Sequence, residues 1–268
     1  MSPQNLLLTT LFLPATLLAG PVEDAKTPEA KGLAVAIEAD KADEGWGDWS
    51  ASAEMTLKNR QGQTSSRQMR FQALEQEDDG DKRLIIFDSP RDVKGTAFLV
   101  FTHKTGNDDQ WLYLPALRRV KRISSNNKSG PFVGSEFAYE DLSSQEVEKY
   151  KYKYLDDHKE TTIGGMDCHV IERYPEDRKS GYTKHIAWYD KKEFRILKTE
   201  YYDRKGSLLK TFTAKGYQAY GNNFWRAATF DMVNHQTGKS TRLSWEGYEF
   251  TKGLPASRFN SSRLNTVR

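Results

Sequence analysis

Few residues of this chain are of a type that could ligate a metal or transfer a proton. Its five histidines are scattered along the sequence: His103, His158, His169, His185 and His235. A zinc site on a helix commonly brings two imidazoles to one face at positions i and i+4, as in HExxH, and no two of these histidines have that spacing. The sequence therefore predicts no metal site and no cofactor.

The other candidates for catalysis are one cysteine and a group of carboxylates. Cys168 and His169 are adjacent, so on a strand they point to opposite faces and the imidazole cannot activate the thiol. Cys168 is better interpreted as a small core residue, and as the only cysteine it has no disulfide partner in the chain. Glu136 and Glu140 would share a strand face about 13 Å apart, too far for a glycosidase pair. With no GxSxG, Walker or dinucleotide motif, we predict that the protein is not an enzyme.

The most distinctive stretch of the sequence runs from Gln110 to Leu142. Trp111 and Tyr113 alternate with leucines, which predicts a strand, and a loop then leads to a second, acidic and aromatic strand over residues 134–142. Four basic residues follow the first strand: Arg118, Arg119, Lys121 and Arg122. We interpret them as a docking surface for an anionic partner or a phospholipid headgroup. The alternative is a solvated strand edge that discourages aggregation.

The charge of the chain excludes one class of partner. Its 40 basic and 37 acidic residues are interspersed and give a net charge of only +3. A nucleic-acid-binding protein typically concentrates positive charge on one face, and this sequence has no such pattern. We therefore expect no nucleic acid partner.

Residues 110–142, QWLYLPALRRVKRISSNNKSGPFVGSEFAYEDL, resemble the signature of the periplasmic outer-membrane lipoprotein-sorting protein family, the LolA/LolB-like group. In that family a similar strand leads through a short loop to a segment like GSEFAYEDL. The segments PRDVKGTAFL (90–99), GWGD (45–48) and MDCHVI (166–171) are similar too, and they occur in the expected order. The resemblance spans roughly residues 28–264.

The resemblance implies a fold and a function. The fold is an incomplete antiparallel β-barrel that wraps a hydrophobic cavity, covered by helices and loops, which accepts acyl chains. The function is that of a monomeric periplasmic carrier or chaperone for a lipid or an acylated lipoprotein, with an inner-membrane transporter or an outer-membrane acceptor as its partner. Two alternatives are a periplasmic interaction or sensor module and an accessory subunit of a resistance-nodulation-division (RND) type envelope lipid exporter.

The beginning of the sequence agrees with export. Leu6–Ala19 is an apolar run too short to span a membrane, and polar residues follow it. We predict a signal peptide over residues 1–20. Pro21 stands where a bacterial lipoprotein would have its lipidated cysteine, so we expect a periplasmic protein without a lipid anchor. Residues 21–268 are expected to form one domain.

The remaining pattern is that of consecutive hairpins after one long helix. Thr27-Pro28-Glu29 is a typical helix start, and the helix is expected to continue to about Glu44. Turn-forming residues then separate alternating segments, which predicts a mainly β protein with a curved sheet of about ten or eleven strands. Among the expected strands are Ser50–Lys58, Arg67–Gln76, Arg83–Asp88, Thr96–His103 and Leu208–Tyr220. A second, short helical piece is expected at Ser143–Tyr150.

The apolar members of the early strands are the candidates for the cavity wall. They are Met55, Leu57, Met69, Phe71, Leu84, Ile86, Phe98, Val100 and Trp111. The alternative for most of them is an ordinary core. Phe132 lies in the loop Ser124–Ser135, which we interpret as a mobile lid that inserts this ring into the cavity mouth. The alternative is a rigid loop in which Phe132 is permanent core.

Overall fold

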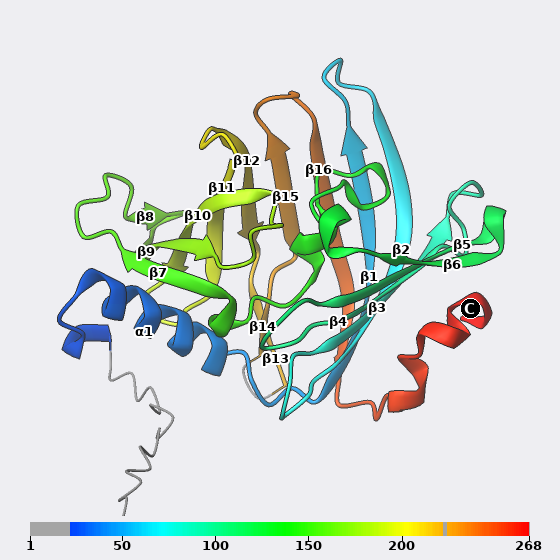
Figure 1. Ribbon diagram of the computed structural model, residues 1–268, viewed down its shortest axis with the longest axis horizontal. Coiled ribbons are helices and arrows are strands. Elements are labelled where there is room, and N and C mark those ends of the chain that lie inside the picture. The colour runs from blue at the N-terminus through cyan, green and yellow to red at the C-terminus, as the bar shows by residue number, and fades with distance from the viewer. Residues whose placement is uncertain (1–21, 222–223, 268) are drawn as a thin grey trace, which may run out of the picture.

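A long antiparallel sheet forms most of this computed structural model, which describes residues 22–221 and 224–267. The predicted signal peptide lies outside the described residues. The sheet has 14 strands in the order β6-β5-β4-β3-β2-β1-β16-β15-β12-β11-β10-β9-β7, with β8 paired to β9. Because the edge strands β6 and β7 do not pair with each other, the sheet curves without closing (Figure 1). The predicted fold class, a mainly β incomplete barrel, is confirmed, although with more strands than expected.

The strands of this sheet have the following bounds: β1 Asp48–Lys58, β2 Thr64–Leu74, β3 Lys82–Ser89, β4 Ala97–Phe101, β5 Asp109–Leu114, β6 Arg119–Ile123, β7 Tyr150–Tyr154, β8 Thr162–Ile163, β9 Met166–Pro175, β10 Tyr182–Asp190, β11 Ile196–Asp203, β12 Leu208–Lys215, β15 Thr229–Asn234 and β16 Ser240–Phe250. Two short strands, β13 (Gln218–Tyr220) and β14 (Phe224–Arg226), pair separately. The single strand expected at Leu208–Tyr220 is thus wrong. Gly216 has a φ of 68°, which turns the chain out of the sheet after β12.

The helix expected after Thr27 is α1, Pro28–Lys41. Thr27 caps it, because its hydroxyl accepts a hydrogen bond from the backbone N–H of Ala30. Gly32 approaches the edge strand so closely that a Cβ there would lie 2.9 Å from the backbone of Lys153. α1 therefore packs directly on the backbone of β7 and covers one end of the sheet (Figure 1).

The chain between β6 and β7, residues 124–149, which we call the connecting segment, lies over the inner face of the sheet (Figure 1). It contains four 3-10 turns: η3 Ser125–Asn127, η4 Phe132–Gly134, η5 Tyr139–Leu142 and η6 Val147–Lys149. The strand expected over residues 134–142 is wrong, because Val133 and Gly134 have positive φ values of 45° and 78° and turn the chain back. Only an isolated bridge from Pro131 to Ala138 forms. Of the helical piece expected at 143–150, only η6 is present.

Alternate residues of the strands face two different apolar clusters. On the inner face, Ile85 and Phe87 of β3 belong to a cluster that includes Phe132 of the connecting segment. On the outer face, Leu84 and Ile86 pack under the C-terminal turns η7 (Ala256–Arg258) and η8 (Ser261–Thr266). α1 and these turns lie at opposite ends of the sheet (Figure 1). A short turn, η1 (Val22–Asp24), precedes α1.

No helix in the described part of the chain is both long enough and apolar enough to cross a membrane.

Candidate ligand-binding cavity

A cavity of about 720 Å³ lies between α1, the connecting segment and the inner face of the sheet. Strands that are far apart in the sheet order contribute to its wall, from β9 and β10 at one end to β1, β2 and β3 at the other. Small-molecule pockets commonly have volumes of roughly 300 to 1,000 Å³. The curvature of the sheet therefore encloses enough space for a small amphiphile.

One part of the wall is aromatic. It is formed by Trp49 of β1, Phe71 of β2, and Trp245 and Tyr248 of β16. The ring centroids of Phe71 and Trp245 are 4.4 Å apart, and those of Trp49 and Trp245 are 6.4 Å apart. Such a wall binds hydrocarbon by removing apolar surface from water, about 25 cal/mol for each Å² buried, and it needs no directional bonds.

The opposite part of the wall is polar and is centred on Arg173 of β9. Only 3% of this residue is exposed. Nη1 donates a hydrogen bond to Tyr189 Oη at 3.0 Å, and Nε has no partner. Burial, with the positive charges of Arg173 and Lys210, lowers the pKa of neighbouring His185 well below its usual value, so this imidazole is neutral. Burial also raises the pKa of Tyr152, which lies opposite Arg173 in the register of β7 and β9.

A buried ion pair lies between the sheet and the connecting segment. Lys210 Nζ of β12 is 2.6 Å from Asp141 Oδ2, and each side chain is 4% exposed. Asp141 also accepts hydrogen bonds from Tyr182 Oη at 2.8 Å and from the backbone N–H of Ala138 at 2.6 Å. Lys210 donates a second bond to the carbonyl of Glu136. These bonds hold η5 against β10 and β12.

Carboxylates with altered titration line the cavity near the end of α1. Burial raises the pKa of Asp40 and of Asp81 to about 6 and that of Glu146 to about 7, and repulsion from neighbouring carboxylates adds to the effect. Asp81 receives hydrogen bonds from Gln76 N and Ser144 Oγ, each at 3.3 Å. This part of the wall therefore becomes less negative when the pH falls below 7.

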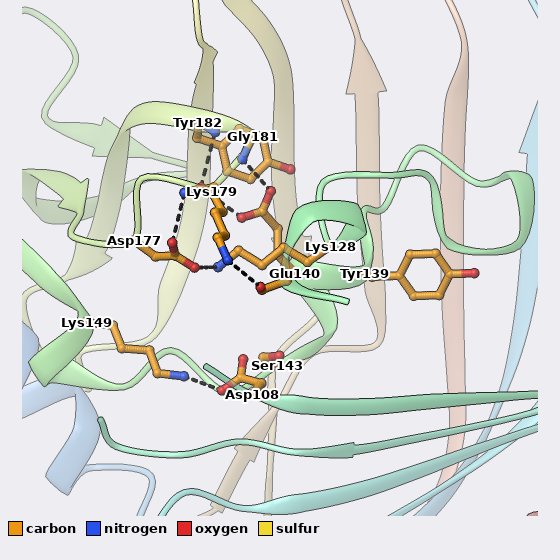
Figure 2. Close-up of polar contacts among 12 residues, drawn as sticks. Asp108, Lys128, Tyr139, Glu140, Ser143, Lys149, Asp177, Lys179, Gly181 and Tyr182 are labelled. Atoms are coloured by element: carbon orange, nitrogen blue, oxygen red, sulfur yellow. Dashed lines mark hydrogen bonds and ion pairs between the residues drawn. The ribbon is translucent and has the colours of Figure 1, made fainter. Parts of the chain in front are cut away.

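Polar contacts tie the connecting segment to the hairpin between β9 and β10 (Figure 2). Lys128 pairs with Asp177 at 2.7 Å, and Glu140 accepts hydrogen bonds from Gly181 N and Ser180 Oγ, both at 2.8 Å. Figure 2 also shows the pair of Lys149 with Asp108 at the other end of the segment. A Cβ at Gly181 would lie 2.7 Å from the Cβ of Ser129, so glycine permits this close contact.

Phe132 lies at the centre of the connecting segment and is fully buried. Its ring centroid lies 5.7 Å from that of Phe87, 5.3 Å from that of Phe98 and 5.7 Å from that of Tyr139. It does not line the cavity. In this conformation the ring fills the space between the segment and β3 and β4. The lid expected at Ser124–Ser135 is therefore packed down, and its mobility stays a prediction.

The residues expected to form the cavity wall are divided between the two faces. Met55, Met69, Phe71, Phe98 and Val100 belong to the inner cluster, and Leu57 packs against it. Leu84, Ile86 and Trp111 belong to the outer cluster instead, so the structure places them away from the cavity. Of the whole predicted set, only Phe71 lines the cavity itself. A role in binding for these residues stays a prediction.

The four basic residues predicted to dock a partner are together and exposed. Arg119, Lys121 and Arg122 lie on the edge strand β6, and Arg118 precedes it with a φ of 48°. Arg122 forms an ion pair with Asp109 of β5. The four basic residues are therefore neighbours at an unpaired edge of the sheet.

Sequence reasoning missed the residues that form the two ends of the cavity. Arg173 and Tyr189 line the cavity from strands whose side chains alternate between the two faces of the sheet. Because both residues are polar, the sequence gave no indication that they face a cavity. Trp245 and Tyr248 are three residues apart, which is not a strand period. They share the cavity because Gly247, with a φ of 65°, interrupts the alternation of β16.

The protein is of the incomplete-barrel class, in which an open antiparallel sheet curves around a cavity under a helix and a long connection. An outer membrane lipoprotein-sorting protein domain from Vibrio parahaemolyticus is similar over 88% of this chain and 98% of its own, with 57% identity and a TM-score of 0.84. A DUF1329 family protein from Desulfovibrio piger is 28% identical over 89% of this chain and 100% of its own, with a TM-score of 0.82.

A LolA superfamily protein from Nitrosomonas europaea has the same fold at 20% identity, with 88% of this chain and 98% of that one covered and a TM-score of 0.66. A family model described as an uncharacterized protein matches residues 79–266. No curated protein matches this chain. The chain belongs to the outer-membrane lipoprotein-sorting protein family and has the fold of the LolA superfamily protein.

Proposed function

We propose that this protein is a periplasmic carrier or chaperone that binds a lipid, or the acyl chains of a lipoprotein, in the cavity of about 720 Å³. The observation that carries the proposal is the aromatic wall of Trp49, Phe71, Trp245 and Tyr248, enclosed under α1 in a member of a lipoprotein-sorting family. The carrier acts in lipoprotein sorting or envelope lipid transport, without catalysis. Its partners are a membrane transporter or acceptor that docks at the basic edge of β6.

Native mass spectrometry of protein purified from the periplasm without detergent tests this proposal. We expect the wild-type protein to carry an extractable lipid or to take up added lipid. Ala39 of α1 lines the cavity, so Ala39→Trp should fill part of it and reduce lipid binding at least tenfold. Ala30→Trp places the same bulk at an exposed position of the same helix and should bind normally.

The result also separates the proposal from the alternatives. A wild-type protein that stays empty with every added lipid would contradict a carrier. If that empty protein captured a defined envelope protein, it would be an interaction or sensor module or an exporter subunit. Folding of both tryptophan variants is checked by circular dichroism.

A further inference from the structure

The polar end of the cavity holds a cation that no carboxylate of the described chain pairs with. In the register of the sheet, Arg173 lies between Tyr152 on β7 and His185 on β10. Its guanidinium has five N–H donors. Only the bond to Tyr189 Oη is made within the described residues, and Nε is buried without a partner. A buried charge of this kind costs free energy unless another group pairs with it.

The groups around Arg173 cannot supply the missing negative charge. Burial keeps Tyr152 and Tyr201 as neutral phenols by raising the pKa of each, and it keeps His185 as a neutral imidazole by lowering its pKa. Asp141 also lines the cavity, but it is already paired with Lys210. Arg173 therefore offers one unneutralised positive charge to whatever enters the cavity.

We propose that Arg173 binds the headgroup of a long-chain carboxylate whose hydrocarbon chain lies along the aromatic wall. A guanidinium and a carboxylate form parallel, charge-assisted hydrogen bonds. The inference rests on the proposed function, because it specifies the chemistry of the ligand that the cavity takes.

The two ends of the cavity suit the two ends of such a molecule. Arg173 and Tyr189 line it on the side of β9 and β10, and Trp49 and Trp245 line it on the side of β1 and β16. A carboxylate at the first side leaves its chain in contact with the second. The acyl chains of a lipoprotein are bound as neutral esters or amides and have no charge that Arg173 could use. The structure thus favours a free acid over an esterified chain.

The test compares palmitic acid with methyl palmitate at pH 7.5, measured by displacement of the neutral fluorescent probe N-phenyl-1-naphthylamine. The two ligands have the same chain and differ in charge. We expect the wild-type protein to bind the acid at least tenfold more tightly than the ester. Arg173→Met should abolish this preference by weakening the binding of the acid at least tenfold. Tyr189→Phe is the control, since it removes the hydrogen bond to Arg173 but keeps the charge, and it should retain the preference.

Each other outcome overturns the inference in a distinct way. Equal binding of acid and ester by the wild-type protein would show that Arg173 does not bind the carboxylate headgroup. A preference for the acid that persists in Arg173→Met would show the same. Tighter binding of hexadecyl phosphate than of palmitic acid would assign the site to phosphate heads. A wild-type protein that binds neither the probe nor any of the three ligands would overturn the proposed function as well. The wild-type comparison needs no variant, so it stands even if Arg173→Met does not fold.

Discussion

Lys210 and Asp141 form an ion pair 2.6 Å long in which each side chain is 4% exposed. Lys210 comes from the sheet and Asp141 from the connecting segment, so the pair joins the cover of the cavity to its wall. A buried pair adds little stability relative to two apolar residues, but removing one partner leaves the other charge buried and alone. The pair therefore makes the position of η5 highly specific.

Asp141→Asn should destabilise the protein by about 3 to 5 kcal/mol, because Lys210 then loses its counter-charge. The free energy of unfolding from urea titration measures this. Arg122→Gln breaks an exposed pair with Asp109, in which the Arg122 side chain is 68% exposed, and should cost less than about 1 kcal/mol. Equal effects of the two substitutions would mean that burial of the Lys210 pair has no energetic consequence.

Glu146 should make stability depend on pH. Its pKa is raised from 4.5 to about 7 in the folded protein, so the folded state keeps a proton that the unfolded chain has lost. The stability from this group is full below pH 4.5 and is lost as the pH rises through 7. Between pH 5 and pH 8 the wild type should lose roughly 2 to 3 kcal/mol more stability than Glu146→Gln. Urea titrations at both pH values measure the difference, and parallel pH profiles would contradict it.

The basic edge strand should bind anionic membranes. Arg119→Glu with Arg122→Glu should weaken binding to phosphatidylglycerol liposomes about tenfold or more at low salt, because two attractive charges become repulsive. The difference should shrink at physiological salt, where screening acts over about 8 Å. Lys191→Glu with Lys192→Glu, two exposed residues between β10 and β11, is the matched control in co-sedimentation. If both double variants bind like the wild type at every salt concentration, β6 is only a solvated edge.

The segment around Phe132 should open when a lipid enters. Burying one phenylalanine contributes about 1.5 to 3 kcal/mol, an amount that an acyl chain can replace. We expect hydrogen exchange of the amides from Asn126 to Gly134 to become at least tenfold faster with bound lipid. Amides of α1 serve as the internal reference. Strong protection that does not change with lipid would mean that Phe132 is permanent core and that no lid exists.

The fold could be predicted because the helix start and the alternation of the strands are local patterns in the sequence. The resemblance to a known family also spans most of the chain. Thr27 and Pro28 mark the start of α1 at its observed position. Alternation identified β1 and β2 within a few residues. The short strand β7, Tyr150–Tyr154, was missed because the expected helical piece was placed immediately before it. Its pairing with β9 lies far along the chain and leaves no local trace.

The faces of the central strands could not be assigned from the sequence. Leu84, Ile85, Ile86 and Phe87 are all buried, because the C-terminal turns cover one face of β3 while the connecting segment covers the other. A run of four apolar residues gives no alternation from which to choose the inner pair. Leu84 and Ile86 were therefore assigned to the cavity, and the structure places them on the outer face.

The polar end of the cavity was beyond sequence reasoning for another reason. Arg173 is an ordinary charged residue in the sequence, and charged residues are normally exposed. Only tertiary packing against β7 and β10 buries it. The aromatic end depends in the same way on the interruption of β16 at Gly247.

The unpaired edges β6 and β7 have a consequence for ligand size. In a closed barrel, the number of strands and their stagger fix the radius. Here no hydrogen bonds join the two edges, so backbone geometry sets no fixed radius for the sheet. Side chains of α1 and the connecting segment fill part of the space inside the curve instead. The same strands can therefore adopt a wider or narrower curve, and a carrier of the kind proposed above would use this freedom to fit hydrocarbon chains of different length and number.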